Sequence, residues 1–232
     1  MSPIIISIDG NIGSGKSTIV KYLQKNFEYF CNNKSNKINK ICFLEEPVKI
    51  WESITDISSN ETIIEKFYKN SKKYSFAFQM MAYISRLSIL KEELQKDFDF
   101  IITERSIYTD RNIFAKMLYL EKNIDDIEWQ VYNKWFDEFS SITKDIKIVY
   151  IRTTPEICDK RIKIRNRKGE NIPIEYLKNC NYYHDSWLNN PQLIEEGKVL
   201  VINGNEETNT SLFIENKYYH DIMSKIYNFM NH

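Results

Sequence analysis

Short, mostly continuous runs of apolar residues recur along this chain and are separated by longer stretches in which apolar and polar residues mix. A short continuous apolar run is typical of a strand that is buried on both faces of a parallel sheet. The pattern predicts five such strands, at residues 4–8, 41–44, 100–103, 146–151 and 199–202.

The longer stretches between the apolar runs predict helices. They cover residues 17–27, 63–68, 75–96, 109–121, 126–139, 155–165, 173–189 and about 212–230. Two polar segments, 32–40 and 203–209, are expected to be loops. Strands that alternate with helices indicate an α/β fold, so we expect one five-stranded parallel sheet flanked by helices in a single domain over residues 1–232.

Polar segments follow four of the predicted strands. They are residues 10–18, 45–47, 104–105 and 203–209. In an open parallel sheet the loops at the carboxyl ends of the strands line the ligand crevice. We therefore expect these four segments to meet at one edge of the sheet.

The first polar segment, residues 10–18, matches the pattern G-x-x-x-x-G-K-[ST] between a predicted strand and a predicted helix. In this phosphate loop, backbone N–H groups converge on phosphate oxygens at the helix N-terminus. Lys16 can reach the β- and γ-phosphates and the Ser17 hydroxyl can hold magnesium, whereas the alternative is an ordinary glycine-rich turn. The predicted phosphate-binding residues are Gly10, Asn11, Ile12, Gly13, Ser14, Gly15, Lys16, Ser17 and Thr18.

Composition excludes several classes of protein. Hydrophobic residues make up 42% and aromatic residues 14% of the 232 residues, which argues against disorder. Lys and Arg together number 32, as do Asp and Glu, so no overall charge attracts nucleic acid or an anionic membrane. The four cysteines lack the spacing of a metal site, and no leader or membrane-spanning run is seen. We expect a cytoplasmic protein, with a nuclear location left open, that binds neither nucleic acid nor membrane.

Charged residues after the second and third strands suggest phosphoryl-transfer chemistry. Transfer to a hydroxyl needs a group that aligns it and accepts its proton, and we favour Glu46 over Glu45 because adjacent strand residues face opposite ways. Arg105 can clamp a phosphate, and Glu104 can hold magnesium directly or through water. The alternatives are a solvated acidic turn at residues 45–46 and a structural ion pair at residues 104–105.

Two helical segments carry further candidates. Gln79, Ala82 and Arg86 share one face of the helix predicted at 75–96, where Gln79 and Arg86 could hydrogen-bond the edge of a base. Phe78 could stack on that base, although a core helix with a snorkelling arginine would show the same pattern. The basic run at 161–168 could neutralise a triphosphate in the transition state, or could be a solvated helix face.

Taken in order, these segments resemble the deoxynucleoside kinases of the deoxycytidine/deoxyguanosine kinase type from about residue 4 to 203. The resemblance rests on residues 10–18, 46–51, 74–79, 104–111 and 161–170. It implies a P-loop NTPase-type fold with an arginine-rich lid at about 161–172, a homodimer, and a role in nucleotide salvage. It also implies Mg²⁺ as cofactor, with ATP or another nucleoside triphosphate as phosphate donor.

The resemblance also implies roles for single residues. Glu46, Arg105 and Lys16 match the catalytic set, in which Glu46 accepts the proton of the nucleoside 5'-hydroxyl. The remaining matches are Ser17 and Glu104 at the magnesium site, Arg161, Arg165 and Arg167 at the donor phosphates, Tyr68 and Glu170 at the sugar 3'-hydroxyl, and Trp51, Phe78, Gln79, Ala82, Arg86, Asp110 and Phe114 around the base.

Arg86 and Asp110 bear on which base is accepted. A carboxylate held by an arginine accepts a hydrogen bond from an exocyclic amino group, whereas thymine would place a second acceptor there. Deoxycytidine and deoxyadenosine carry such an amino group. Deoxyguanosine offers a carbonyl there, but the resemblance keeps it open, because the purine binders of this family have the same Asp and Arg. Alternatives are a thymidine-accepting or broad-specificity deoxynucleoside kinase, a thymidylate-type monophosphate kinase, and a nucleotide-binding switch or assembly protein.

Overall fold

The computed structural model describes residues 2–34, 40–143, 146–167, 170–206 and 217–231. Within them, β1 (Ile4–Asp9), β2 (Ile41–Leu44), β3 (Phe100–Glu104), β4 (Lys147–Arg152) and β5 (Val199–Asn203) form one sheet. The strand order is β2-β3-β1-β4-β5, and every pair of neighbours is parallel. The predicted strands and the predicted α/β fold class are confirmed.

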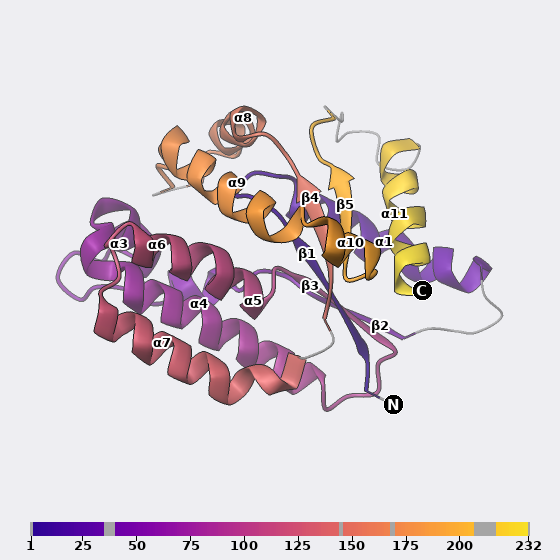
Figure 1. Ribbon diagram of the computed structural model, residues 1–232, viewed down its shortest axis with the longest axis horizontal. Helices are drawn as coiled ribbons and strands as arrows, with labels where there is room; N and C mark the ends of the chain where they lie inside the picture. Colours follow the sequence, from indigo (N-terminus) through magenta and orange to yellow (C-terminus); the bar gives the residue numbers. More distant parts are fainter. Residues whose placement is uncertain (1, 35–39, 144–145, 168–169, 207–216, 232) are drawn as a thin grey trace.

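Helices flank both faces of this sheet (Figure 1). They are α1 (Lys16–Lys34), α2 (Val48–Glu52), α3 (Ile63–Lys69), α4 (Ser71–Glu93), α5 (Ile107–Thr109), the π-helix η1 (Asp110–Ala115), α6 (Lys116–Leu120), α7 (Asp126–Phe139), the 3-10 turn η2 (Ser140–Thr143), α8 (Pro155–Arg165), α9 (Ile174–Leu188), α10 (Pro191–Glu195) and α11 (Lys217–Met230).

Successive side chains of the inner strands point to opposite faces and enter different cores. Ile6 and Ile8 of β1 pack with residues of α1 and α11 on one face. Ile5 packs with Leu90 of α4 on the other face. Tyr150 of β4, on that same second side, packs against Leu188 of α9. This two-sided covering explains why the inner strands are continuous apolar runs.

The edge strand β2 differs from the sequence prediction. All four of its residues are half-buried, because β3 is its neighbour on one side only. A short apolar run alone cannot distinguish an edge strand from an inner one. Both faces of β2 are covered, because Ile41 and Phe43 pack against one core and Cys42 and Leu44 against the other, but less completely than those of the inner strands.

The helices differ from the prediction mainly at their ends and in the helix predicted at 109–121. That stretch is divided into α5, the π-helix η1 and α6, and the short elements α2, η2 and α10 were not predicted. Helix α1 runs to Lys34, so the loop predicted at 32–40 is helical at its start, and residues 35–39 lie outside the described residues. Residues 207–209 of the other predicted loop and 212–216 of the last predicted helix also lie outside them.

Local capping explains several of these boundaries. Thr62 and Glu65 form a capping box at the start of α3, and Asp125 and Glu128 form another at the start of α7. Helix α8 ends at Asn166, whose φ of 46° is left-handed and turns the chain out of the helix.

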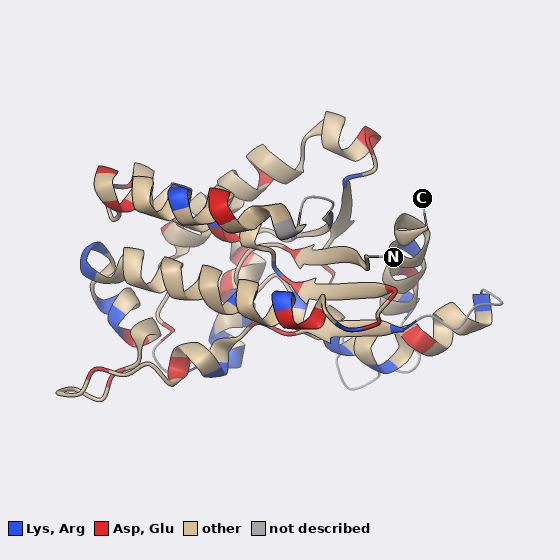
Figure 2. Cartoon of the chain, turned by 90° about the horizontal axis from the view of Figure 1, so that it is seen from below, with Lys and Arg blue, Asp and Glu red and all other residues tan. Residues whose placement is uncertain are grey.

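Basic and acidic residues are interspersed along the outer helices (Figure 2). This mixing agrees with equal numbers of basic and acidic residues in the sequence. Among the helices that the structure describes, none combines the length and the apolar character needed to cross a bilayer.

Candidate active site

The phosphate loop joins β1 to α1, and two of its glycines are required by close backbone contacts. A Cβ atom on Gly10 would lie 2.6 Å from the carbonyl oxygen of Ile151, and one on Gly13 would lie 2.6 Å from that of Cys158. Both glycines have positive φ values, 148° and 76°. The loop therefore lies directly on β4 and α8, with the N-terminus of α1 turned toward its concave side.

Lys16 is buried within this loop. Its Nζ donates a hydrogen bond to the carbonyl oxygen of Asn11 at 2.7 Å. Burial, and then the positive charge of Arg105, lower the pKa of Lys16 to about 8. The pKa of Lys16 is therefore only slightly above neutral pH. An anion at the loop would favour the charged form of the lysine.

Ser17 and Glu104 meet beside the phosphate loop. The Ser17 hydroxyl donates to Oε1 of Glu104 at 2.6 Å, and Glu104 is buried at the end of β3. A hydroxyl and a carboxylate fit Mg²⁺, which takes few protein oxygens and keeps phosphate oxygens and water for its other ligands. The described residues contain no group of three or more His, Cys, Asp or Glu side chains that could form a metal site by themselves.

Glu46 follows β2 and is held by two arginines. Its Oε1 accepts hydrogen bonds from Nε of Arg105 at 3.1 Å and from Nη2 of Arg86 at 3.2 Å. Burial alone would raise the pKa of Glu46, but Arg105, Arg86 and Lys16 together lower it to about 2. The carboxylate is thus ionised throughout the physiological range. Glu45 is exposed and does not line the cavity that Glu46 lines.

Arg105 has a left-handed backbone, with φ at 65°. For a residue other than glycine this costs about 1–3 kcal/mol, and the surroundings must hold it in place. Its N–H donates to the carbonyl oxygen of Ile8 at 3.1 Å, and Nη1 donates to that of Gly10 at 2.9 Å. The guanidinium also lies 4.7 Å from the centre of the Phe114 ring.

Arg86 links α4 to the π-helix. Its Nε donates to Oδ2 of Asp110 at 2.9 Å, and its Nη1 donates to the carbonyl oxygen of Glu104 at 2.7 Å. Burial raises the pKa of Asp110, and the Arg86 guanidinium opposes that rise. On the same face of α4, Gln79 is buried, and its Oε1 has no hydrogen-bond partner within the described residues. An unsatisfied buried acceptor is expected where a ligand donates to it.

Aromatic rings surround these polar groups. Trp51 and Phe78 meet edge to face, with ring centres 5.5 Å apart. The indole N–H of Trp51 donates to the hydroxyl of Ser85 at 2.9 Å, which fixes the ring. Phe67 lies 4.9 Å from Phe78, and the small Ala82 is buried in the same cluster as Trp51. The result is an apolar slot with one polar wall.

The predicted lid begins on α8. Arg161 donates from Nη1 to the carbonyl oxygen of Ser14 at 3.0 Å, so it touches the phosphate loop. Arg165 donates from Nη2 to both carboxylate oxygens of Glu170, at 2.6 and 2.5 Å. Arg167 lies on the cavity wall, and residues 168–169 of the lid lie outside the described residues.

One cavity of about 730 Å³ unites these groups. Every site residue predicted from the sequence lines it except Gly10 and Asn11, which are buried at the start of the phosphate loop. We call its two ends the phosphate end, around residues 12–18 and Arg161, and the α4 end, around Gln79.

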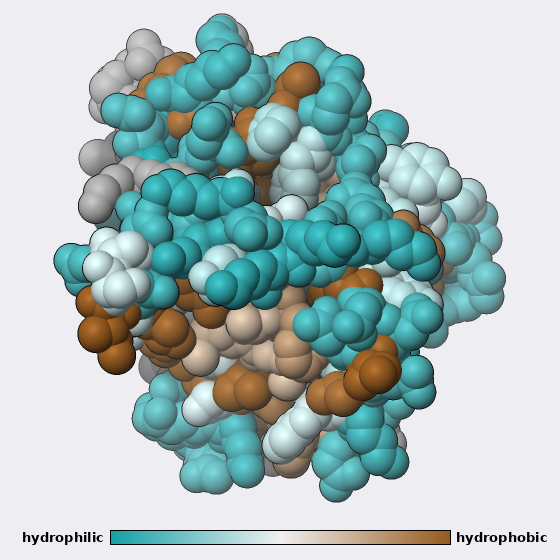
Figure 3. Space-filling model, turned by 90° about the vertical axis from the view of Figure 1, so that its left-hand side faces the viewer, coloured by the Kyte–Doolittle hydropathy of each residue, from teal (hydrophilic) through white to brown (hydrophobic). Residues whose placement is uncertain are grey.

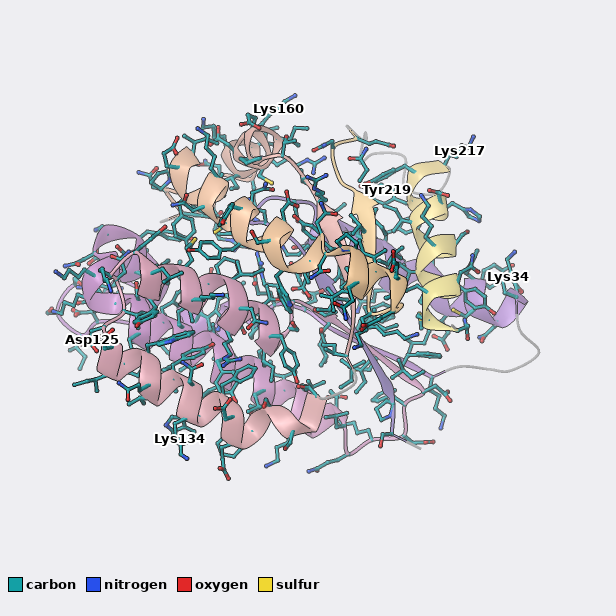
Figure 4. The ribbon with its side chains drawn as sticks, in the orientation of Figure 1. Lys34, Asp125, Lys134, Lys160, Lys217 and Tyr219 are labelled. Carbon is teal, nitrogen blue, oxygen red and sulfur yellow. The ribbon has the colours of Figure 1, made fainter. Side chains whose placement is uncertain are left out.

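Sequence reasoning missed some of the lining. Tyr218 and Tyr219 of α11 line the phosphate end, although they lie far along the chain from the other site residues. Lys160 of α8 and Tyr219 of α11 come to this end from different elements (Figure 4). At the α4 end, Ile64 and Phe67 were also missed. None of these has a local signal in the sequence, because an apolar or aromatic residue in a helix usually serves the core.

Comparison with known proteins agrees with this geometry. A family model described as deoxynucleoside kinase matches residues 6–231. A probable deoxycytidine kinase of fowlpox virus is 34% identical over 232 residues, covering 97% of this chain and 88% of the relative. Human deoxycytidine kinase is 32% identical over 219 residues, covering 87% and 84%. The mitochondrial deoxyguanosine kinase of Xenopus laevis is 33% identical over 202 residues, covering 79% and 72%.

Binding of a nucleoside triphosphate is expected to take up a proton above pH 8. The pKa of Lys16 is about 8 in the free protein, and phosphate charge raises it, so affinity should fall as pH rises above 8. At pH 9 about 0.9 proton per site should be taken up, because a group of pKa 8 is then about one-tenth charged. Calorimetry in two buffers of different ionisation enthalpy measures this number.

Phosphate groups themselves lose their last proton near pH 6, so they contribute little to this uptake. Lys16→Met is the control variant and should abolish it. Binding at pH 9 without proton uptake would contradict the depressed pKa of Lys16.

Proposed function

This chain belongs to the deoxynucleoside kinase family and is a deoxynucleoside kinase of nucleotide salvage, and on that premise we propose that its acceptor is deoxycytidine or a purine deoxynucleoside. The reaction transfers a γ-phosphoryl group to the 5'-hydroxyl, and we propose ATP or another nucleoside triphosphate as donor. A thymidylate-type kinase or a nucleotide-binding switch is no longer needed to explain the phosphate loop.

The observation that carries this choice of base is the pairing of Arg86 with Asp110. Arg86 holds Asp110 at 2.9 Å inside the α4 end, where Gln79 presents an unpartnered Oε1. The exocyclic amino groups of cytosine and adenine can donate to such acceptors. Thymine would bring a carbonyl oxygen against a carboxylate, and the cost of two facing acceptors in a buried slot is about 1–3 kcal/mol.

The chemistry proposed for the site depends mainly on positioning. Phosphoryl transfer passes through a loose transition state, in which little of the hydroxyl proton has yet been transferred to the catalytic base. A carboxylate of pKa about 2 is a weak base, but Glu46 is ionised and fixed by two arginines, so it can align the 5'-hydroxyl and accept its proton late. Arg105 and Lys16 then stabilise the charge on the transferred group.

Kinases of this family in general use ATP with Mg²⁺, and we propose that Ser17 and Glu104 hold the ion here. The ion would neutralise charge on the donor phosphate oxygens. The direct hydrogen bond between the two residues supports this assignment, since both present oxygen at one point beside the phosphate loop.

We also propose that the enzyme is a homodimer through α7. Ile127, Val131 and Trp135 lie four residues apart on this helix and are 73%, 39% and 47% exposed. In the end-on view of Figure 3, apolar surface gathers in the lower half of the molecule, the level that α4 and α7 occupy in Figure 1. An exposed apolar stripe of this kind is expected to be covered by a partner. A second copy of the chain agrees with the homodimer that the family resemblance implies.

A phosphate-transfer assay tests the proposed function. The enzyme is incubated with γ-labelled ATP, Mg²⁺ and each of the four deoxynucleosides in turn. We expect labelled monophosphate from deoxycytidine or a purine deoxynucleoside, and the lowest kcat/KM for thymidine. Thymidine as the preferred acceptor would instead favour a thymidine-accepting or broad-specificity enzyme, and no transfer to any of the four would overturn the proposal.

Glu46→Gln should lower kcat by about two to four orders of magnitude with little change in nucleoside affinity. The amide keeps the size of the side chain but cannot accept the proton. Glu45→Gln is the matched control, because Glu45 is adjacent and exposed, and it should leave kcat unchanged. Turnover of Glu46→Gln close to that of the wild type would exclude Glu46 as the base.

The double change Arg86→Met and Asp110→Ala should raise the kcat/KM for thymidine relative to deoxycytidine about 10- to 100-fold. Removing both partners leaves no buried charge unpaired. The ratio is the readout, because Arg86 also touches Glu46 and its loss slows all substrates. The control is the surface pair Arg152→Met and Asp185→Ala, and a ratio equal to that of the wild type would refute the gating role.

Trp135→Glu should convert the dimer to a monomer in sedimentation-velocity runs at micromolar concentration. A charge within the apolar stripe would be buried without a partner. Ile57→Glu is the control, because Ile57 is fully exposed in the loop before α3 and lies outside the stripe. A monomeric wild-type enzyme, or a dimer that survives Trp135→Glu, would show that α7 is not the interface.

A further inference from the structure

The ion pair between Arg165 and Glu170 joins the end of α8 to the segment before α9. A single nitrogen of Arg165, Nη2, donates to both oxygens of Glu170 at 2.6 and 2.5 Å. The side chain of Glu170 is only 5% exposed, whereas that of Arg165 is 35% exposed. The carboxylate is therefore the buried partner, and its charge depends on the arginine for compensation.

The pair lies between two parts of the cavity wall. Arg161 lies one helical turn before Arg165 on α8 and touches the phosphate loop through the carbonyl oxygen of Ser14. Glu170 lies close to Tyr68 of α3, where it adds to burial in raising the pKa of the phenol. The pair thus connects α8, beside the phosphate end, with Tyr68 at the wall of the apolar slot.

We propose that Arg165 is a positioning residue for Glu170, and that their ion pair couples binding of the donor triphosphate to binding of the deoxynucleoside sugar. This inference rests on the proposed function, since it takes the sugar 3'-hydroxyl as the ligand of Glu170 and Tyr68. A Glu170 carboxylate with both oxygens on Arg165 is not oriented for a new donor. A triphosphate offers Arg165 another anion and so releases Glu170 toward the 3'-hydroxyl.

The coupling works in both directions. A 3'-hydroxyl that donates to Glu170 weakens the ion pair between this carboxylate and Arg165. Arg165 then binds phosphate more readily. By linkage, each substrate must strengthen binding of the other by the same factor. A nucleoside that lacks the 3'-hydroxyl makes no contact with Glu170 and should bind without this effect.

The test measures dissociation constants on the wild-type enzyme by calorimetry. The probe is the Mg²⁺ complex of a non-hydrolysable ATP analogue, titrated alone, with saturating best-accepted deoxynucleoside, and with the 2',3'-dideoxy form of that nucleoside. We expect the deoxynucleoside to tighten binding of the analogue about fivefold or more, in the usual range of coupling between sites. The dideoxynucleoside should change it less than twofold.

Two variants locate the coupling. Arg165→Ala and Glu170→Gln should each reduce the deoxynucleoside effect to less than twofold, even though Arg165→Ala also weakens binding of the analogue itself. Lys178→Ala is the matched control, because Lys178 forms a Lys–Glu pair with Glu175 on the exposed face of α9. It should keep the full coupling. Thermal melting confirms that each variant is folded, and the dideoxynucleoside comparison requires no variant.

The outcomes separate this inference from the proposed function. If deoxynucleoside and analogue both bind but neither affects the other, the inference fails and the kinase assignment stands. Equal coupling with the deoxy and dideoxy forms, or full coupling in Arg165→Ala, also overturns it. If no deoxynucleoside binds or is phosphorylated, the proposed function fails and the inference fails with it.

Discussion

The guanidinium of Arg86 is the interaction on which the site depends. It is buried, and its three nitrogens donate to Asp110 of the π-helix, to the carbonyl oxygen of Glu104 at the end of β3, and to the carboxylate of Glu46 after β2. Helix α4, the residue after β2 and the stretch from β3 to the π-helix are therefore held at one point. Because the guanidinium is always charged, it compensates the buried carboxylate of Asp110 and, together with Arg105, that of Glu46. The same contacts bring the carboxylates of Asp110 and Glu46 to one guanidinium.

Backbone geometry supplies the second constraint. Gly10 and Gly13 bring the phosphate loop against β4 and α8, and Arg105 keeps a left-handed backbone that its contacts must maintain. The π-helix η1 begins at Asp110 and contains Phe114, so both line one cavity from a single short element. Irregular helical turns of this kind are common at functional sites, because they re-aim side chains that a regular helix would place elsewhere. Local strain here is balanced by contacts formed by the rest of the fold.

The arginines of the site divide into two groups with different surroundings. Arg86 and Arg105 are buried and bonded to carboxylates and carbonyl oxygens that belong to the sheet edge. Arg161 and Arg165 lie on α8, and both are more exposed. A buried arginine keeps its hydrogen-bond partners in a fixed arrangement, whereas an exposed arginine exchanges partners at a low cost in free energy. One side of the cavity is therefore fixed by buried arginines, whereas the arginines of α8 are more exposed.

The sequence by itself determined the strands, the phosphate loop and the set of segments that meet in the cavity. These signals are local, since an apolar run, a glycine spacing or a helix face can be seen within a few residues. It could not determine that β2 lies at the edge, that residues 110–115 form a π-helix, or that Tyr218 lines the phosphate end. Nor could it show that Arg86 reaches Glu46 or that Arg165 pairs with Glu170. Those features depend on which elements pack together and on which charges share one desolvated space, and only the tertiary structure decides both.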